Sequence, residues 1–353
     1  MSPVAFLFIG LLSALIADSS PFGHESNDNG DFFTLAVGTM KPMLKTYYYV
    51  NVSVGTPPQP LTLALAFDSV SPWLYDQNTD VQCVYPLYVS DYFDYRNSST
   101  FAVYENTSDP SFFYARDTLE LTSLDGDAPL VVLNQSWFVE EYQYEDQWCT
   151  PTSGYLGLGV PYDGKSGIAG VCQRIGDNVL TVAPPLPEDP AESPFVLTLG
   201  AADSKRCSDD WVWQECLWAD YSDCPFQLSA FRFGAYELDG KGALIHLSNY
   251  TYLPSDALDA VQRQLQYDPW QQGVPCDGEK PDLVFEIGGT FEIHLTAAEY
   301  SQWGTDYCEL LVLDAEAAGT EFLYMLSVQL FNNHCQLLSY GNSSTAFAHK
   351  LAV

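Results

Sequence analysis

The amino-acid sequence predicts an all-β fold arranged in two lobes. Short runs of β-branched, aromatic and other apolar residues, many of them alternating with polar residues, recur about every ten residues between turn signals, which is typical of strands. Three clear examples are Tyr47–Val54, Leu61–Phe67 and Leu283–Ile287. Helical periodicity is rare along the chain. Its 353 residues are enough for about two domains of roughly 100–200 residues each.

Few segments predict a helix. The stronger candidate is Ser255–Gln266, where Pro254 precedes the segment, Ser255 can cap it and apolar residues recur at helical spacing. A second, short helix is expected at Thr296–Trp303. The proline-rich stretch Ala183–Pro190 reads as a loop near the midpoint of the chain. The two lobes are therefore expected to meet around residue 200.

The charge balance excludes two classes of partner. The chain has 46 acidic and 13 basic side chains, which give a formal net charge of -33 at pH 7. Nucleic acids and anionic membrane surfaces bind clustered Lys and Arg, and the scattered cations of this chain do not supply such a patch. Because 47% of the residues are hydrophobic, the high charge does not indicate disorder. We expect a folded protein with no nucleic-acid or membrane partner.

The N-terminal segment predicts export from the cell. The apolar stretch Val4–Ile16 is too short to span a bilayer as a helix, and small residues follow it at Ala17, Ser19 and Ser20. This layout is typical of a secretory signal peptide, which we place at residues 1–19. A short polar leader at residues 20–45 is expected to follow it. The mature protein is then secreted, into the extracellular space or an acidic lumenal compartment.

Glycosylation motifs and cysteines agree with export. Six Asn-X-Ser/Thr sequons follow the predicted signal peptide, with their asparagines at Asn51, Asn97, Asn106, Asn134, Asn249 and Asn342. The nine cysteines include no Cys-X-X-Cys pair and are accompanied by only five histidines, so we expect disulfides and no metal or other cofactor. Because nine is odd, one thiol is left free or pairs with a disulfide-linked partner chain.

A series of short motifs supports a more specific hypothesis. They are GTPPQ (55–59), FDSVS (67–71), SSTF (98–101), DTL (117–119), GYLGLG (154–159), LTLG (197–200) and FEIGG (285–289). Their order and intervals resemble those of the pepsin-like aspartic proteases, from about Thr46 to the C-terminus. The resemblance implies the bilobal acid-protease fold, with two β-barrel-like lobes at residues 46–200 and 201–353 around a central cleft.

In that family each lobe contributes one Asp-Thr/Ser-Gly loop to the cleft. Two carboxylates about 3 Å apart cannot both ionise, so they share one proton across an acidic pH range. The ionised carboxylate takes a proton from the water held between them, while the protonated one polarises the peptide carbonyl. Neither carboxylate does this alone. The second aspartate therefore decides whether the resemblance implies peptide-bond hydrolysis.

The two loops of this chain depart from the family pattern to different extents. The first keeps the catalytic-type Asp68 and the hydroxyls of Ser69 and Ser71, although Val70 replaces the glycine. In the second, counting back from the stretch that ends at Pro254 places the aspartate position on Ile245 or, with a one-residue shift, on His246. Neither residue is acidic. The family's second catalytic carboxylate is therefore expected to be absent.

His246 also suggests a second hypothesis, an acid–base or metal pair with Asp68. A metal site needs three or four ligands, and no cluster of His, Asp or Glu with suitable spacing is visible in the sequence. We favour the alternative in which His246 fills a vacated polar pocket. The resemblance further implies that Tyr104 is the tyrosine of a flap hairpin, although the flap glycines are missing and Asn106 places a sequon near its tip.

The same resemblance implies a disulfide between Cys276 and Cys308 in the C-terminal lobe. A Cys149–Cys172 pair would close a loop around the GYLGLG motif, and a Cys207–Cys335 pair would form a long-range bond. The other pairings cannot be read from the sequence.

Three functions remain open at this stage. The first is a secreted pepsin-like protein that has lost proteolysis and binds an extended peptide or protein in its cleft, with Asp68, Ser69, Ser71 and Tyr104 as cleft residues. The second is an active aspartic endopeptidase whose second acid is an Asp elsewhere in the chain or in a partner chain. The third is a structural or storage glycoprotein without a ligand. The sequence favours the first, because the second loop lacks its acid.

Overall fold

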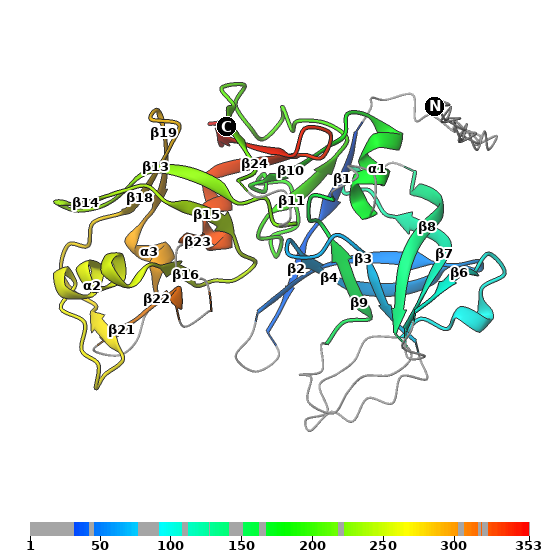
Figure 1. The fold of residues 1–353 in the computed structure, drawn as a ribbon, viewed down its shortest axis with the longest axis horizontal. Coiled ribbons are helices and arrows are strands. Elements are labelled where there is room, and N and C mark those ends of the chain that lie inside the picture. Colours follow the sequence, from blue (N-terminus) through cyan, green and yellow to red (C-terminus); the bar gives the residue numbers. More distant parts are fainter. Residues whose placement is uncertain are drawn as a thin grey trace, which may run out of the picture. The chain divides into compact units, whose positions relative to one another are not determined.

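The computed structural model describes residues 32–41, 46–76, 92–107, 112–126, 128–140, 151–161, 167–217, 222–302, 307–316, 319 and 324–352 (Figure 1). All of them belong to one compact unit, Asp31–Val353. The predicted signal peptide at residues 1–19 lies outside the described residues. Within them, strands predominate and helices are few, which confirms the predicted all-β class.

The first of two eight-stranded sheets is built from the N-terminal half of the chain. Its strands, in spatial order, are β2 (Gly38–Met40), β3 (Tyr47–Val54), β4 (Gln59–Ala66), β9 (Gly154–Gly157), β5 (Trp73–Tyr75), β8 (Leu130–Glu140), β7 (Phe112–Leu121) and β6 (Ala102–Asn106). An additional pairing of β3 with β7 closes this sheet into a barrel. The alternation of apolar and polar residues predicted a strand at Tyr47–Val54, and β3 has these bounds.

The second eight-stranded sheet is built from the C-terminal half. Its path runs through β19 (Phe291–Leu295), β18 (Leu283–Ile287), β13 (Phe226–Phe233), β15 (Gly242–Ile245), β23 (Tyr324–Leu326), β16 (Thr251–Leu253) and β22 (Val312–Asp314), and β14 (Tyr236–Asp239) pairs with β13. A small sheet of β17 (Gly273–Pro275), β21 (Tyr307–Leu310) and β20 (Ser301–Gln302) accompanies it.

A six-stranded sheet joins strands from both halves of the sequence. Its order is β1 (Phe33–Ala36), β11 (Val196–Leu199), β10 (Val179–Ala183), β24 (His334–Ser339), β25 (Ser344–His349) and β12 (Val212–Glu215). Phe33 and Leu35 of β1 are buried, so this part of the predicted leader is a structural part of the sheet. The lobe boundary near residue 200 stays a prediction.

Three α-helices lie within the described residues, together with short 3₁₀ helices at Tyr95–Asn97 and Val328–Asn332. Helix α2 (Ser255–Gln264) and helix α3 (Ala297–Tyr300) confirm the two predicted helices. Pro254 rather than Ser255 occupies the N-cap position of α2. Helix α1 (Gly167–Ile175) was not predicted. Its glycines and β-branched residues have low helix propensity, so only packing of its apolar face favours this helix.

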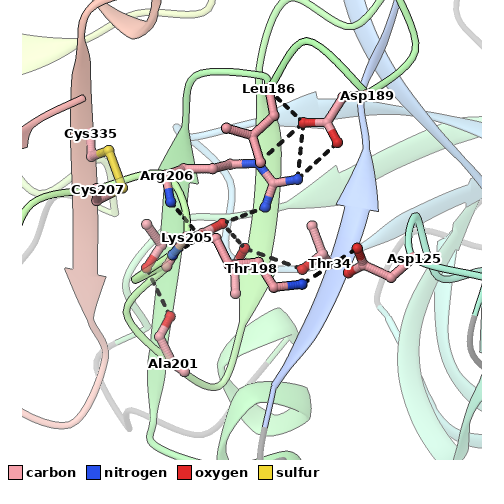
Figure 2. A network of polar contacts seen from close by, with 12 residues as sticks. Thr34, Asp125, Leu186, Asp189, Thr198, Ala201, Lys205, Arg206, Cys207 and Cys335 are labelled. Carbon is pink, nitrogen blue, oxygen red and sulfur yellow. Dashed lines mark hydrogen bonds and ion pairs between the residues drawn. A yellow bond between two sulfur atoms is a disulfide. The ribbon is translucent and has the colours of Figure 1, made fainter. Parts of the chain in front are cut away.

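Buried charges are matched inside the six-stranded sheet region (Figure 2). The Arg206 side chain is 2% exposed and makes ion pairs with Asp189 at 2.9 Å and Asp203 at 3.0 Å. Thr198 of β11 donates a hydrogen bond to Asp203, which ties the cluster to the sheet. The adjacent Cys207 forms a disulfide with Cys335 of β24. A guanidinium this deeply buried is tolerated because its charge and its donors are satisfied.

The disulfides bear out two of the three proposed pairs. The Cys276–Cys308 and Cys207–Cys335 bonds are both formed, and a third bond joins Cys216 to Cys224. The Cys149–Cys172 pairing is wrong, because Cys172 has no disulfide partner; Cys149 lies outside the described residues. Cys172 is on the buried face of α1, where burial raises the pKa of its thiol to about 12.

Within the described part of the chain, no helix has the length and apolar character needed to cross a membrane.

Candidate functional site

The loop that carries Asp68 follows β4 at the point where this strand pairs in parallel with β9. The carbonyl of Ser69 accepts a hydrogen bond from the Gly159 N–H at 2.9 Å, and the Ser69 hydroxyl donates to the Ser71 carbonyl at 3.1 Å. A Cβ on Gly157 would lie 2.6 Å from the Ser69 carbonyl oxygen, so the loop can pass here only because residue 157 is glycine. The Asp68 side chain is exposed to solvent.

The structure explains how Val70 replaces the family's glycine. Val70 is not among the described residues that have a positive φ, so its backbone conformation suits a residue with a side chain. The close approach is made by a different glycine. A Cβ on Gly167, the first residue of α1, would lie 2.2 Å from the Val70 carbonyl oxygen. The loop therefore keeps its contact with the helix although its own glycine is gone.

The parallel pairing of β15 with β23 repeats that of β4 with β9 and thus aligns the two loops. Leu65 of β4 pairs with Leu156, and Ile245 of β15 pairs with Leu326. Asp68 lies three residues after Leu65, and counting three residues on from Ile245 gives Ser248 as its counterpart in this register. Beyond the strands the two loops diverge, because the Leu158 N–H donates to the Ala66 carbonyl whereas the equivalent Val328 N–H donates to the Ser248 carbonyl. The sequence-derived positions, Ile245 and His246, differ from this register by two to three residues.

Ile245 is buried inside β15 and cannot occupy the loop position. The His246 backbone N–H still continues the pairing with β23, because it donates to the Leu326 carbonyl at 2.9 Å. At Ser248, the side-chain oxygen accepts a hydrogen bond from the Tyr250 N–H at 3.0 Å. No residue from 245 to 249 is acidic, so the second loop lacks a carboxylate in either register.

Asn249 fastens the second loop to the first sheet. Its amide oxygen accepts from the Tyr48 hydroxyl at 2.6 Å and from Gln329 at 3.3 Å, while its amide nitrogen donates to the Thr46 hydroxyl at 3.2 Å. A glycan would be attached to this same nitrogen. The other five predicted glycosylation asparagines, Asn51, Asn97, Asn106, Asn134 and Asn342, are exposed. Whether any sequon is occupied stays a prediction.

A carboxylate that the sequence reasoning missed lies beside the Asp68 loop. The Ser222 hydroxyl donates to the Asp68 backbone carbonyl at 2.9 Å, and the Val160 N–H donates to the Ser222 carbonyl at 2.6 Å. The next residue, Asp223, is half-buried. Burial raises the pKa of the Asp223 carboxyl, and the negative charge of Asp68 raises it further.

Asp223 is thus an acidic residue, within the described part of the chain, that lies close enough to Asp68 to interact with it. It comes from the segment that the Cys216–Cys224 disulfide closes, not from the second loop. In the sequence only the short spacing of these two cysteines hints at a constrained loop, and nothing directs that loop toward Asp68.

The predicted flap tyrosine lies on an exposed hairpin. Tyr104 belongs to β6, which pairs with β7, and is 47% exposed. The Tyr104 ring centroid lies 6.1 Å from that of Tyr114. The guanidinium carbon of Arg116 lies 4.8 Å from the Tyr104 ring centroid. Such a cation–π contact stabilises the ring at an exposed position by about 0.5–1 kcal/mol.

A cavity of about 310 Å³ opens beside Tyr104. We call it the flap cavity and define it by its lining residues, Ser71, Pro72, Tyr104, Tyr114, Asn134, Gln135, Ser136, Trp137, Phe138, Gly167, Gly170 and Arg174. It brings together two of the predicted cleft residues, Ser71 and Tyr104, with the sequon residue Asn134. Asp68 and Ser69 do not line it.

Comparison with known proteins gives a consistent result. The family model of the eukaryotic aspartyl proteases matches residues 47–323. Aspartic protease 1 of Caenorhabditis elegans is 25% identical over 339 residues, which cover 86% of this chain and 82% of the relative. Aspartic protease 17 of the same organism is 24% identical over 330 residues, with the same coverage of both chains.

Proposed function

This chain belongs to the eukaryotic aspartyl protease family, and from that premise we propose that it is a secreted protein that binds an extended peptide or protein segment without cleaving it. One observation carries the proposal: residues 245–249, which include every counterpart of Asp68 counted from the sequence or from the strand register, contain no Asp or Glu. The family's chemistry needs two facing carboxylates that share a proton. Removing one member of such a unit typically costs several orders of magnitude in rate.

The surroundings of Tyr104 support a binding role. Strand β6 is the last strand of its sheet, and its residues are exposed, so within the described part of the chain its outer edge can accept a further strand. Addition of a peptide strand to a sheet edge supplies main-chain hydrogen bonds, and an adjoining pocket supplies specificity. The flap cavity, with Tyr104, Tyr114 and Trp137 in its wall, is such a pocket. An accessible aromatic pocket also favours ligand binding over a storage role.

The decisive experiment is a cleavage assay on the purified, secreted protein. Unfolded protein is offered as substrate from pH 2 to pH 7, with and without pepstatin. We expect no cleavage that pepstatin inhibits, and the same background from the variant Asp68→Asn. Pepstatin-sensitive cleavage that Asp68→Asn abolishes would contradict the proposal.

One observation favours a second function, that of an active aspartic endopeptidase with Asp223 as the second acid. Ser222 is hydrogen-bonded to the Asp68 loop, and the Asp223 carboxyl has a pKa raised by burial and by Asp68. A carboxylate that shares a proton with another needs a raised pKa of this kind. In the same assay, activity abolished by Asp223→Asn but kept by Asp239→Asn, an exposed acid at the end of β14, would establish this alternative.

A further inference from the structure

Two arginines near Tyr104 have no ion-pair partner. Arg96, Arg206 and Arg232 each make ion pairs with Asp or Glu side chains. Arg116, Arg174 and Arg263, in contrast, form no ion pair with any carboxylate of the described residues. Arg263 lies on the exposed face of α2, whereas the other two lie near Tyr104. Both lie at the flap cavity or at the ring of Tyr104, which borders it.

Arg174 is placed where a ligand group could reach it. It lies in the last turn of α1 and lines the flap cavity together with Gly167 and Gly170 of the same helix face. Because these two residues are glycines, neither contributes a side chain to the cavity wall. One of its donors, Nη1, is bound to the Leu133 carbonyl at 3.0 Å. A guanidinium carries five N–H donors, so most of them remain available.

The electrostatic environment of Arg174 is that of a cation without a counter-ion. Partial burial lowers the pKa of Arg174, whereas nearby carboxylates raise the pKa of Arg206 and of Arg232. Arg174 is an exposed residue, so an anion in the flap cavity can reach its guanidinium. The described wall of the cavity contains no Asp or Glu that could fill the same role.

Two tyrosine hydroxyls belong to the same wall. Tyr104 and Tyr114 both line the flap cavity with Arg174. A phenol hydroxyl can donate a hydrogen bond to an anion. The cavity thus combines a cation without an ion-pair partner and two hydroxyl-bearing side chains.

We propose that the flap cavity binds the carboxylate of an Asp or Glu side chain in the bound peptide, with Arg174 as its cationic partner. This inference rests on the proposed function, because it names the kind of peptide that the site accepts. A volume of about 310 Å³ is at the lower end of ligand pockets, roughly 300–1,000 Å³, and suits one side chain. A planar guanidinium and a carboxylate form strong, charge-assisted hydrogen bonds, often in pairs. Arg116, stacked on Tyr104, adds a second positive charge near the cavity.

The test uses two immobilised libraries of random decapeptides that contain no other charged residues. One library carries Glu at a fixed central position and the other carries Gln there. At pH 7 we expect the wild-type protein to bind the Glu library at least about tenfold more tightly. Arg174→Gln should lose this preference and still bind the Gln library. The matched control is Arg263→Gln, which removes the same charge from an exposed position on α2 and should keep the preference.

The protonation state of the peptide gives a second readout. As the pH falls below about 4, the Glu side chain becomes neutral and the preference of the wild-type protein should disappear. Equal binding of the two libraries at pH 7, or an equal loss of preference in Arg174→Gln and Arg263→Gln, would overturn the inference. The second of these results would point to net charge instead of this cavity.

A small-molecule arm separates the inference from the proposed function. The two blocked amino acids N-acetylglutamate amide and N-acetylglutamine amide are titrated into the wild type and Arg174→Gln while the arginine Nε–H signals are followed by NMR. If neither library binds, the proposed function fails, and this titration still decides the cavity. Binding of the glutamate derivative to the wild type alone supports the inference. Acetate binding as tightly as the glutamate derivative would overturn it in favour of a site for free carboxylates.

Discussion

Arg206 and Arg174 place the same side chain in two regions of the molecule with opposite surroundings. Arg206 lies beside the six-stranded sheet, where two aspartates match its charge and almost no solvent reaches it (Figure 2). Arg174 lines the flap cavity, and no described carboxylate pairs with it. The difference distinguishes a structural role from a binding role. A buried charge that is paired with opposite charges stabilises the fold, whereas an accessible charge without an ion-pair partner is available to bind a ligand.

The largest expected effect concerns Arg206, the arginine whose charge is paired with two aspartates. Arg206→Met leaves Asp189 and Asp203 buried without their cation, so the free energy of unfolding should fall by about 3–5 kcal/mol. Arg174→Met should change it by less than about 1 kcal/mol, because no ion pair is broken. Denaturant unfolding of the purified variants measures both values. Similar losses in the two variants would remove the distinction between the two arginines.

A pH titration tests how a buried charge without a partner affects stability, here at a buried histidine. Burial, together with a smaller effect of the neighbouring His349 and His294, lowers the pKa of His334 from 6.5 to about 4. In the unfolded chain this histidine binds its proton at higher pH than in the folded protein. Its contribution to stability is therefore present above pH 6.5 and is lost, by up to roughly 3 kcal/mol, as the pH falls through about 4.

The measurement for His334 is the difference between the wild type and His334→Gln in unfolding free energy, from pH 7 to pH 4. We expect the variant to lose less stability over this range. Glu140 acts in the opposite sense, since burial raises its pKa to about 7 and its contribution is lost as the pH rises, so the difference and not the total is informative. An identical pH dependence of the two proteins would show that His334 titrates normally.

A smaller effect is expected at the hydrogen bonds that hold the second loop. Asn249→Ala removes contacts to Tyr48, Thr46 and Gln329 and leaves the buried Tyr48 hydroxyl without this acceptor. We expect thermal or denaturant unfolding to show a loss of about 1–2 kcal/mol. Asn342→Ala, at an exposed sequon, serves as the control and should stay within about 0.5 kcal/mol. A neutral Asn249→Ala would mean that this side chain has no role in fixing the loop.

The smallest effect concerns the two acids of the site, where like charges meet. Asp68→Asn removes one negative charge, so the pKa of Asp223 should fall toward its usual range while burial still holds it above that range. An NMR titration of the side-chain carboxyl carbons measures this shift, with Asp239→Asn as a variant that should leave it unchanged. No change in Asp223 on Asp68→Asn would separate the two carboxylates and weaken the endopeptidase alternative.

Features with a local signature could be predicted from the sequence. The alternation at residues 47–54 and 283–287 identified β3 and β18, and helical spacing after Pro254 identified α2. Helix α1 escaped prediction because glycines at positions 167 and 170 oppose a helix locally, and the helix forms through the packing of its apolar face. For the same reason the side of α1 on which Cys172 lies could not be read, and its pairing was predicted wrongly.

The sequence by itself determined that the second loop carries no acid, since residues 245–249 contain none in any register. Only the tertiary structure gave the register in which Ser248 is counted as the counterpart of Asp68, because that register depends on pairing with β23, about 80 residues further along the chain. It also brought Ser222 and Asp223 to the Asp68 loop and Arg174 to the flap cavity. Contacts of this kind join residues far apart in the chain, and no local pattern of side chains records them.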